Sequence, residues 1–521
     1  MVFKFFNLWK ILPVIISLPI IFVFIGIALS FFKTDFSNFS HIYEYLLFDA
    51  LSNTIVLILG VVILTSMIGI SLAWITVTYE FLGRKFFIWA LVLPMAIPGY
   101  VMAFAMVGIF EYSGPFNSFL RNFFGSNIST FNIYSYPGLV ITLSLSLYPY
   151  SYLLLRNAFQ TQAIKSLEVG QSLGLSRHRS TLRISLPLAK PWILGGALLV
   201  VMETMADFGT VSVFNYNTLT TVIYKSWFDL YSLSTALQIA SILLVFAVFI
   251  GLYDRKLRKN QLYSWGGTSP KSRKRILLKS YWFIVPTIFC GSIFLIGFVF
   301  PVIRLITWAL PNLSFETLNQ FFYLSLSSIK LSILGTLVIT IISLLLVFSS
   351  RLNKGYFSEF LSLFSTLGYA LPGVVLAVSL YSLYTPFFSI FESTIIVMLL
   401  AYTVRFLAVA HTPIDRSLLR VTRSMDAVSN TMAVSGLSMF RKIHMPLIRA
   451  GTLTAMVLVF VDIMKELPIT LMTRPFEMNT LAVKVYEYSS EGLWEYAALP
   501  ALAIVLVGFL PILILLLRTE K

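Results

Sequence analysis

Long uninterrupted apolar runs constrain the fold of this chain more than any other feature. Two clear examples cover residues 11–32 and 233–253. About 20 residues rising about 1.5 Å each cross a hydrocarbon core of roughly 30 Å, and the backbone inside it must satisfy its hydrogen bonds within its own helix. The sequence therefore predicts an all-α membrane protein, and the hydropathy of its 521 residues predicts about twelve transmembrane helices.

The first apolar run follows Lys4 and Lys10, an arrangement that also occurs in cleavable signal peptides. The apolar segment of a signal peptide is usually about 7–15 residues long, and this run is longer. We therefore expect it to be retained as the first transmembrane helix.

Lysine and arginine account for the net charge of +16 and gather in a few stretches between the apolar runs, namely 177–190, 254–275 and 405–449. By the positive-inside rule these loops are cytoplasmic, and an even number of spans places both termini on that side. Nucleic-acid binding is the rival explanation of basic runs. Because these loops are held between transmembrane helices, we expect contact with the lipid bilayer and none with nucleic acid.

Parts of the sequence occur twice. Residues 51–65 resemble residues 326–340 at an offset of about 275, and the pair Pro98-Gly99 returns as Pro372-Gly373. The offset shortens by about fifteen residues further along, and the extra residues of the first copy lie in the polar stretch 113–136. The repeat predicts two homologous six-helix halves, 1–253 and 280–521, joined by a basic cytoplasmic linker, 254–279.

The two Pro-Gly pairs lie inside predicted spans. Proline lacks the backbone N–H that a helix needs and glycine is flexible. We therefore expect the third and ninth spans to break or kink at Pro98-Gly99 and at Pro372-Gly373.

A second repeated element lies between the fourth and fifth spans of each half, near 165–190 and near 416–448. Each copy reads as helix, turn and helix, and ends at a proline, Pro187 or Pro446. In the second copy Val421, Met425, Val428 and Met432 form one apolar stripe of an amphipathic helix. Such a stripe fits a lipid surface or a groove on a partner protein, and the residues alone leave both open.

The spacing of Glu168, Gly170, Gly174, Ile184 and Pro187 resembles the coupling-loop signature of permease subunits of binding-protein-dependent ABC importers. The resemblance implies that these residues dock onto a separate ATPase, with Glu168 as a polar contact and Gly174 in a tight turn. The second copy departs from the pattern, since Ala433 replaces the glycine and Asp426 stands one position before the expected acid. The corresponding residues there are Asp426, Ala427, Ala433, Ile443 and Pro446.

The segments 206–228 and 464–492 are similar to those of fused ferric-iron importer permeases, and this resemblance covers essentially the whole chain. It implies a type I ABC importer permease fold in a bacterial cytoplasmic (inner) membrane. The implied partners are a periplasmic substrate-binding protein and a homodimeric ABC ATPase on the cytoplasmic side. Thiamine and phosphonate permeases share this architecture, and an ion-coupled secondary transporter with six plus six helices is a further alternative.

The sequence contains no G-x-x-x-x-G-K-[ST] loop that would bind nucleotide phosphates. We therefore expect the chain itself to be no enzyme and to hold no cofactor, with ATP and magnesium on the partner ATPase. Cys290 is its only cysteine, so neither a disulfide framework nor a thiolate metal cluster can form, and we expect no resident metal site.

Acidic residues inside spans are costly, by at least about 2.5 kcal/mol at the helix centre. Glu203 and Asp207 match Asp462 and Glu466 at an offset of 259, and each pair is spaced to share one helix face. The four acids either line the translocation path or serve as interhelical anchors or outer-surface residues. Carboxylate oxygens suit a hard cation such as ferric iron, but a permease must bind its cargo weakly in order to release it.

Overall fold

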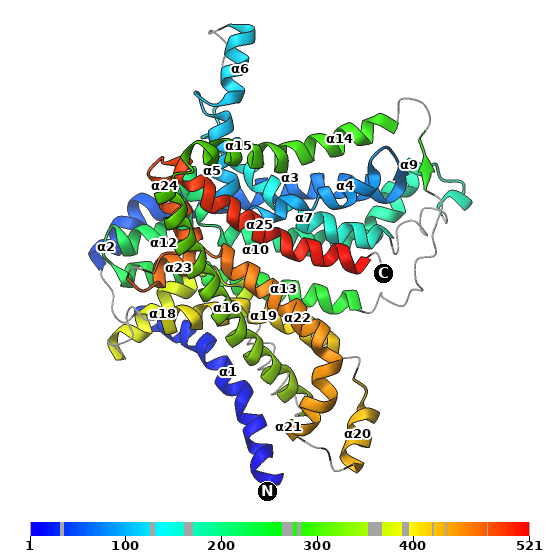
Figure 1. Cartoon of the computed structure of the whole chain (residues 1–521), viewed down its shortest axis with the longest axis vertical. Coiled ribbons are helices and arrows are strands. Elements are labelled where there is room, and N and C mark those ends of the chain that lie inside the picture. Colours follow the sequence, from blue (N-terminus) through cyan, green and yellow to red (C-terminus); the bar gives the residue numbers. More distant parts are fainter. Residues whose placement is uncertain are drawn as a thin grey trace. The chain divides into compact units, whose positions relative to one another are not determined.

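The computed structural model is helical along most of the chain that it describes (Figure 1). It describes residues 2–31, 36–125, 131–160, 170–262, 275–278, 283–352, 367–387, 395–418, 421–432, 434, 436–476 and 478–519. Within these ranges, ten helices are long and apolar enough to cross a membrane, or up to eleven if one bent pair counts as a span. The all-α membrane fold is confirmed. The number twelve is not, because part of the expected ninth span falls on 353–366, outside the described residues.

The elements follow in chain order. The first part contains α1 (Val2–Ser30), α2 (Phe36–Ile42), η1 (Tyr43–Leu47), α3 (Phe48–Thr78), β1 (Tyr79–Glu80), α4 (Arg84–Ala90), η2 (Leu93–Ala96), α5 (Gly99–Phe110), α6 (Pro115–Phe124), α7 (Tyr136–Ala158), α9 (Arg177–Ser180), η4 (Thr181–Ser185), α10 (Leu186–Ala206), α11 (Gly209–Val213), α12 (Leu219–Phe228) and α13 (Leu233–Leu262).

The second part contains β2 (Ile276–Leu277), α14 (Ile284–Phe294), η6 (Leu295–Val299), α15 (Phe300–Ala309), η7 (Leu310–Asn312), α16 (Phe315–Leu352), η8 (Leu367–Ala370), α18 (Gly373–Phe387), α19 (Ile395–Leu418), α20 (Arg423–Thr431), α21 (Gly436–Met439), η10 (Phe440–His444), α22 (Met445–Lys465), α23 (Pro468–Thr473), α24 (Leu481–Ser490) and α25 (Trp494–Thr519).

The chain forms two compact units whose bounds differ from those of the two predicted halves. Unit 1 consists of Met1–Phe39, Ile223–Val245 and Asn319–Val483, and unit 2 of Ser40–Val222, Phe246–Leu318 and Lys484–Lys521. In unit 1, α1 of the first half packs against α18 and α19 of the second. In unit 2, α15 and α25 of the second half pack against α5 and η2 of the first. Each unit therefore combines the middle spans of one half with end spans of the other.

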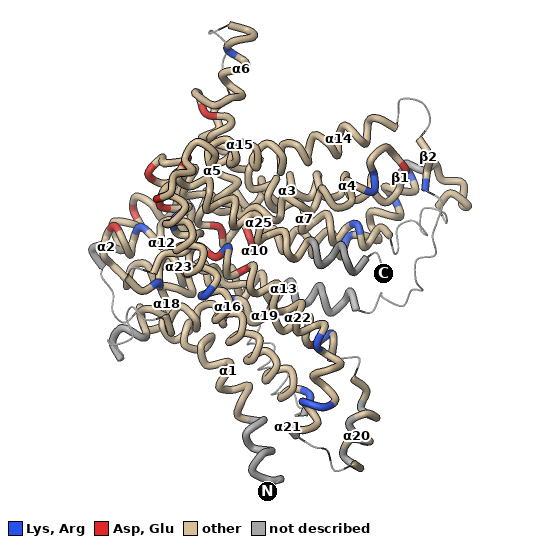
Figure 2. Tube along the Cα trace, in the orientation of Figure 1, with Lys and Arg blue, Asp and Glu red and all other residues tan. Residues whose placement is uncertain are grey.

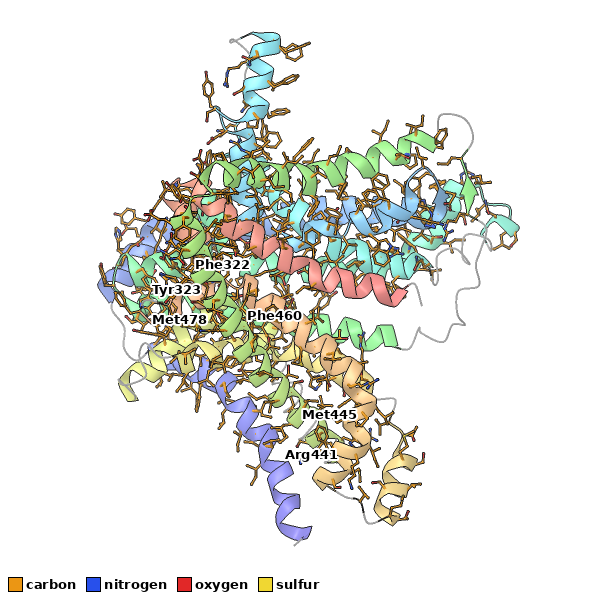
Figure 3. The ribbon with its side chains drawn as sticks, in the orientation of Figure 1. Phe322, Tyr323, Arg441, Met445, Phe460 and Met478 are labelled. Carbon is orange, nitrogen blue, oxygen red and sulfur yellow. The ribbon has the colours of Figure 1, made fainter. Side chains whose placement is uncertain are left out.

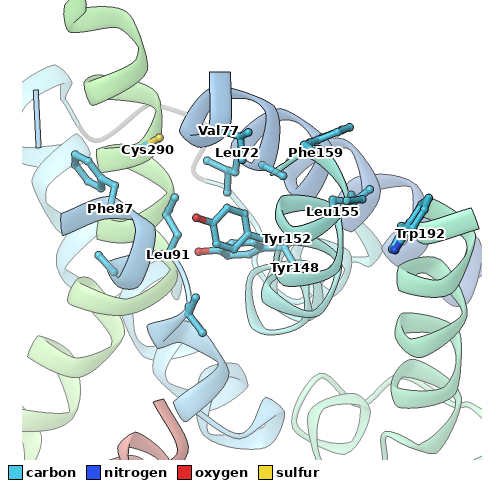
Figure 4. Packing of buried hydrophobic residues seen from close by; sticks show 14 of the residues in the cluster. Leu72, Val77, Phe87, Leu91, Tyr148, Tyr152, Leu155, Phe159, Trp192 and Cys290 are labelled. Atoms are coloured by element: carbon cyan, nitrogen blue, oxygen red, sulfur yellow. The ribbon is translucent and has the colours of Figure 1, made fainter. Parts of the chain in front are cut away.

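The core of unit 2 is built around α3, α7 and α10, which pack against one another. Small residues let these helices approach closely, because an added Cβ on Gly69 would lie 2.8 Å from the Ser151 Cβ. Tyr148 and Tyr152 fill the centre of this core, with Cys290 of α14 buried beside them (Figure 4). The end of the predicted linker forms β2, which pairs in parallel with β1 in a short two-stranded sheet of unit 2.

Helices α10 and α22 correspond to each other and have the same local construction. Each follows a π turn, closed by a hydrogen bond from Leu186 N to Thr181 O in one copy and from Met445 N to Phe440 O in the other. Pro187 and Pro446 lie in the first turn after it. The wider π turn accommodates a proline, which has no N–H to donate and whose ring crowds the preceding turn.

Candidate functional site

We call the two repeated segments near 165–190 and near 416–448, which are predicted to dock onto an ATPase, the first and second coupling elements. The first is described from Gly170 onward, so Glu168 lies outside the described residues. The short helix there ends with hydrogen bonds from Leu175 N to Gly170 O and from Gly174 N to Gln171 O, both 3.0 Å. Gly174 has φ of 82°, in the left-handed region. Glycine adopts this conformation without the steric cost that a Cβ imposes, so the expected tight turn is present at Gly174.

Gly170 is the point where the two arms of this element meet. A Cβ added to Gly170 would overlap Ser180 Oγ and lie 2.9 Å from Ile184 Cδ1. Ser180 is fully buried and Ile184 is half-buried, whereas Pro187 is exposed. The structure thus brings Gly170 and Ile184 together and leaves Pro187 at the surface.

The second coupling element repeats this backbone pattern. Val434 N donates to Ser429 O at 2.9 Å, and these residues correspond to Leu175 and Gly170 at the offset of 259. The Ser429 hydroxyl is buried and donates to Val434 O at 2.7 Å. A serine that bonds back to its own loop therefore stands where the first copy has glycine.

The remaining predicted residues of this copy are spread along it. Ala427 in α20 and Pro446 in α22 are exposed, and Ile443 in η10 is half-buried. Ala433 and the side chain of Asp426 lie outside what the structure describes. Figure 3 shows Arg441 and Met445 where η10 leads into α22.

The predicted apolar stripe is largely open. Val421 is buried, but Met425, Val428 and Met432 are 41%, 58% and 71% exposed. Basic residues occur near both elements (Figure 2): in unit 2 many Lys and Arg lie at the end with α4, β1 and β2, and in unit 1 some lie near α21. Each element therefore offers a charged, partly apolar surface at one end of its unit.

The structure also brings each Pro-Gly break close to an acidic residue. From the sequence alone, these breaks and acids are separate features. In unit 2, η2 ends before an extended Ile97-Pro98 segment and α5 begins at Gly99. The helical segments before and after this break are bent by 98°. Asp207 follows the last residue of α10 and lies against this break. We call Ile97, Gly99, Ser146, Asp207 and Thr210 the unit 2 joint.

The Asp207 carboxylate caps the next short helix. Oδ1 accepts from Thr210 N (2.9 Å) and Val211 N (3.2 Å), and Oδ2 accepts from Thr210 Oγ1 (2.8 Å). A Cβ on Gly99 would lie 3.0 Å from Asp207 Oδ2, so glycine allows the start of α5 to approach the acid. The carboxylate thus lies near the N-termini of α5 and α11, where the helix dipoles favour negative charge.

Unit 1 repeats this arrangement with one difference. Glu466 follows α22, and its Oε1 accepts from Ile469 N at 3.1 Å. A Cβ on Gly373 would lie 2.9 Å from Oε1. Arg405 of α19 adds an ion pair, with its Nε 3.4 Å from Glu466 Oε2. We call Leu371, Gly373, Arg405, Glu466 and Ile469 the unit 1 joint.

Ser146 and Arg405 occupy equivalent positions in the two joints. Ser146 Oγ donates to Ile97 O at 3.4 Å, and Arg405 Nη1 donates to Leu371 O at 3.3 Å. Both acceptors are the residue before the proline. In the described part of the chain, Asp207 has no ion-pair partner. The two joints are alike in backbone and unlike in charge.

The two members of each acidic pair differ in their position relative to the end of the helix. Helix α10 ends at Ala206 and α22 ends at Lys465, so Asp207 and Glu466 are caps outside these helices. Glu203 and Asp462 remain within the helices and are half-buried. The acids bond forward to the N–H groups of α11 and α23, and this local bonding competes with continuation of the helix.

Sequence reasoning missed Arg405 and Ser146. A cation within the apolar run 391–413 is itself a signal, since intramembrane charges need a partner. Among the described residues, no group of three or more His, Cys, Asp or Glu is placed to hold a metal ion.

Comparison with known proteins supplies the class of this fold. Residues 65–259 match the family described as binding-protein-dependent transport system inner membrane component. The fold is that of an all-α membrane permease, and over residues 65–259 the chain is similar to the binding-protein-dependent class.

Two relatives match the chain over most of its length. The chain is 28% identical over 472 residues to the Fe(3+)-transport system permease protein FbpB 2 of Haemophilus influenzae, covering 90% of this chain and 89% of that protein. It is 24% identical over 447 residues to the ferric transport system permease protein FbpB of Actinobacillus pleuropneumoniae, covering 80% and 63%. The resemblance to fused ferric-type permeases is confirmed by these two matches.

A third relative matches only about half of the chain. The molybdate/tungstate transport system permease protein WtpB of Pyrococcus abyssi is 25% identical over 255 residues, which is 48% of this chain and 92% of that protein. That relative is thus about half as long as this chain.

Proposed function

We propose that this chain is the permease subunit of an ATP-driven ABC importer that passes ferric iron from an external binding protein to the cytoplasm. The observation that carries the proposal is the construction, found twice, of a coupling element, a long helix and a joint. The names of two relatives support the choice of cargo, because both are ferric-iron permeases and one matches nearly the whole chain.

Transport then proceeds by alternating access. Closure of an ATPase dimer on the cytoplasmic side moves the two coupling elements, which carry Gly170 and Gly174 in one copy and Ala427 and Ile443 in the other. Each element continues through a π turn into a helix of 21 residues, about 30 Å long at 1.5 Å per residue. A displacement at the coupling element therefore reaches the joint at the far end of the helix, where the Pro-Gly break permits a change of direction.

The four acids divide into two roles under this proposal. Asp207 and Glu466 already accept hydrogen bonds from the chain itself, so they anchor the joints. Glu203 and Asp462 are the remaining candidates for the translocation path. Carboxylate oxygens are suitable ligands for a hard cation. A site with only a few such ligands would bind the cation weakly enough to release it.

Reconstitution tests the proposal and its alternatives. Proteoliposomes containing this permease, its ATPase and its binding protein should take up radioactive ferric iron only with ATP, and uptake should cease when the ATPase is omitted. Uptake driven by an ion gradient without ATPase would establish the secondary transporter instead. ATP-dependent transport of thiamine, phosphonate or molybdate, without transport of iron, would support an ATP-driven importer with a different substrate.

A further inference from the structure

Helix α6 (Pro115–Phe124) lies in the polar stretch 113–136 that only the first half contains, between α5 and α7. A segment that joins two successive spans lies at a membrane surface. Figure 1 shows α6 running across the direction of α14 and α15 of the same unit and projecting beyond them. These observations place α6 beside the bundle instead of within it.

The polar side of α6 is tied to its own loop. Asn117 is 1% exposed and donates through Nδ2 to Phe110 O at 2.6 Å and to Glu111 O at 3.2 Å. Arg121 donates to Tyr112 O at 2.6 Å, and its guanidinium lies 4.0 Å from the centre of the Tyr112 ring. These bonds fix the rotation of the helix about its axis.

The opposite side of α6 is wholly apolar. Its five residues recur at i, i+3, i+4, i+7 and i+8, which is one stripe of a helix, and they are Phe116, Phe119, Leu120, Phe123 and Phe124. Phe119, Phe123 and Phe124 are 61%, 72% and 62% exposed. The Phe119 and Phe123 rings stack on each other at 5.9 Å. We call these five residues the α6 stripe.

Lipid is the occupant that the surroundings favour. Aromatic residues concentrate at the membrane–water interface, and α6 carries one cation and no acid, so it does not repel anionic headgroups. Other elements of unit 2 also present apolar side chains outward, such as Leu59 and Ile63 of α3, as a lipid-facing bundle does. A soluble partner that comes and goes would leave the stripe in water between encounters, which is costly.

We propose that α6 is an in-plane helix that inserts its stripe into the headgroup and acyl boundary of the membrane. Helices of this kind lie about 5–10 Å deep at that boundary. The helix thereby fixes the start of the first-half loop against the membrane surface. This inference depends on the membrane fold and is independent of the identity of the cargo.

Spin-label accessibility in the full-length protein tests the proposal. Cys290→Ala removes the only native cysteine, and Phe119→Cys or Asn122→Cys then introduces one label on the stripe or on the exposed polar side. The protein is reconstituted in liposomes of phosphatidylethanolamine and phosphatidylglycerol, without any partner. We expect the label at 119 to collide several-fold more often with oxygen than with a water-soluble nickel complex, and the label at 122 to show the reverse.

Equal access of the nickel complex to both labels would overturn the proposal and leave the stripe free for a soluble partner. Shielding of the label at 119 from both reagents would also overturn it, because the stripe would then pack on protein. Phe123→Cys provides a second stripe position, so that poor insertion of one variant does not decide the outcome.

Discussion

Arg405→Ser is the substitution that most directly tests the unit 1 joint. It gives this joint the residue that the unit 2 joint already has, since Ser146 is the equivalent of Arg405. The change removes the ion pair with Glu466 and the bond to Leu371 O, while the cap from Glu466 to Ile469 N can remain. Glu466 is then left without this cation in a buried position.

The size of the effect follows from distance and burial. The side chains of Arg405 and Glu466 are 13% and 6% exposed, and the ion pair spans 3.4 Å. At an effective dielectric constant of about 20, the Coulomb attraction over this distance is about 5 kcal/mol. Removing one member of a buried pair costs about 3–5 kcal/mol in measured cases. We therefore expect a loss of about 3–5 kcal/mol in the free energy of unfolding.

The assay is equilibrium unfolding in mixed micelles, with Ser146→Ala as the matched control. The control removes one long hydrogen bond and should cost about 0.5–1.5 kcal/mol. The double variant Arg405→Ser/Glu466→Gln should be more stable than the sum of the two single effects, because it leaves no unpaired charge. Simple additivity, or a single variant as stable as the parent, would refute the assignment of Arg405 as the partner of Glu466.

Three further predictions, which use four substitutions, test the first coupling element and the packing of unit 2. Gly174→Pro should leave the protein inserted but abolish substrate-stimulated ATP hydrolysis by the assembled importer, because proline cannot adopt the φ of 82° found there; normal stimulation would count against the docking assignment. Gly170→Ala should weaken the same stimulation, because the added methyl overlaps the Ser180 hydroxyl, and Ser180→Gly should restore it if that overlap is the cause. Gly108→Ala should lower the stability of the detergent-solubilised protein by about 1–3 kcal/mol, because its methyl would overlap the Trp308 ring; an unchanged unfolding transition would show that the ring does not pack there.

Backbone features at the breaks and turns were predictable from the sequence. The Pro-Gly pairs mark the starts of α5 and α18, since a proline followed by glycine cannot continue a helix. Pro187 and Pro446 are 259 residues apart, and the first and last residues of α10 and α22 differ by the same number. These features depend on local chemistry, which a single sequence contains.

The side-chain partners of the acids were not predictable in the same way. Spacing placed Asp207 four residues after Glu203 on one helix, but the carboxylate instead caps α11 and ends α10. A cap and a continuing helix differ by about 1 kcal/mol at such a position, so tertiary contacts decide between them. The approach of Gly99 to Asp207 is one such contact, and it joins positions more than a hundred residues apart.

The composition of the two compact units explains why a repeat in sequence does not identify a folding unit. An apolar span presents similar leucine and valine surfaces to many neighbours, so its partner is chosen by small residues that permit close approach. Gly26 of α1 lies so close to α18 that an added Cβ would be 3.0 Å from Ser379 O, and an added Cβ on Gly508 of α25 would overlap the Ala96 carbonyl. Both contacts join opposite halves. Each compact unit therefore contains spans from both predicted halves. Because both predicted halves belong to one chain, this exchange of spans is intramolecular, which raises the effective concentration of each half for the other.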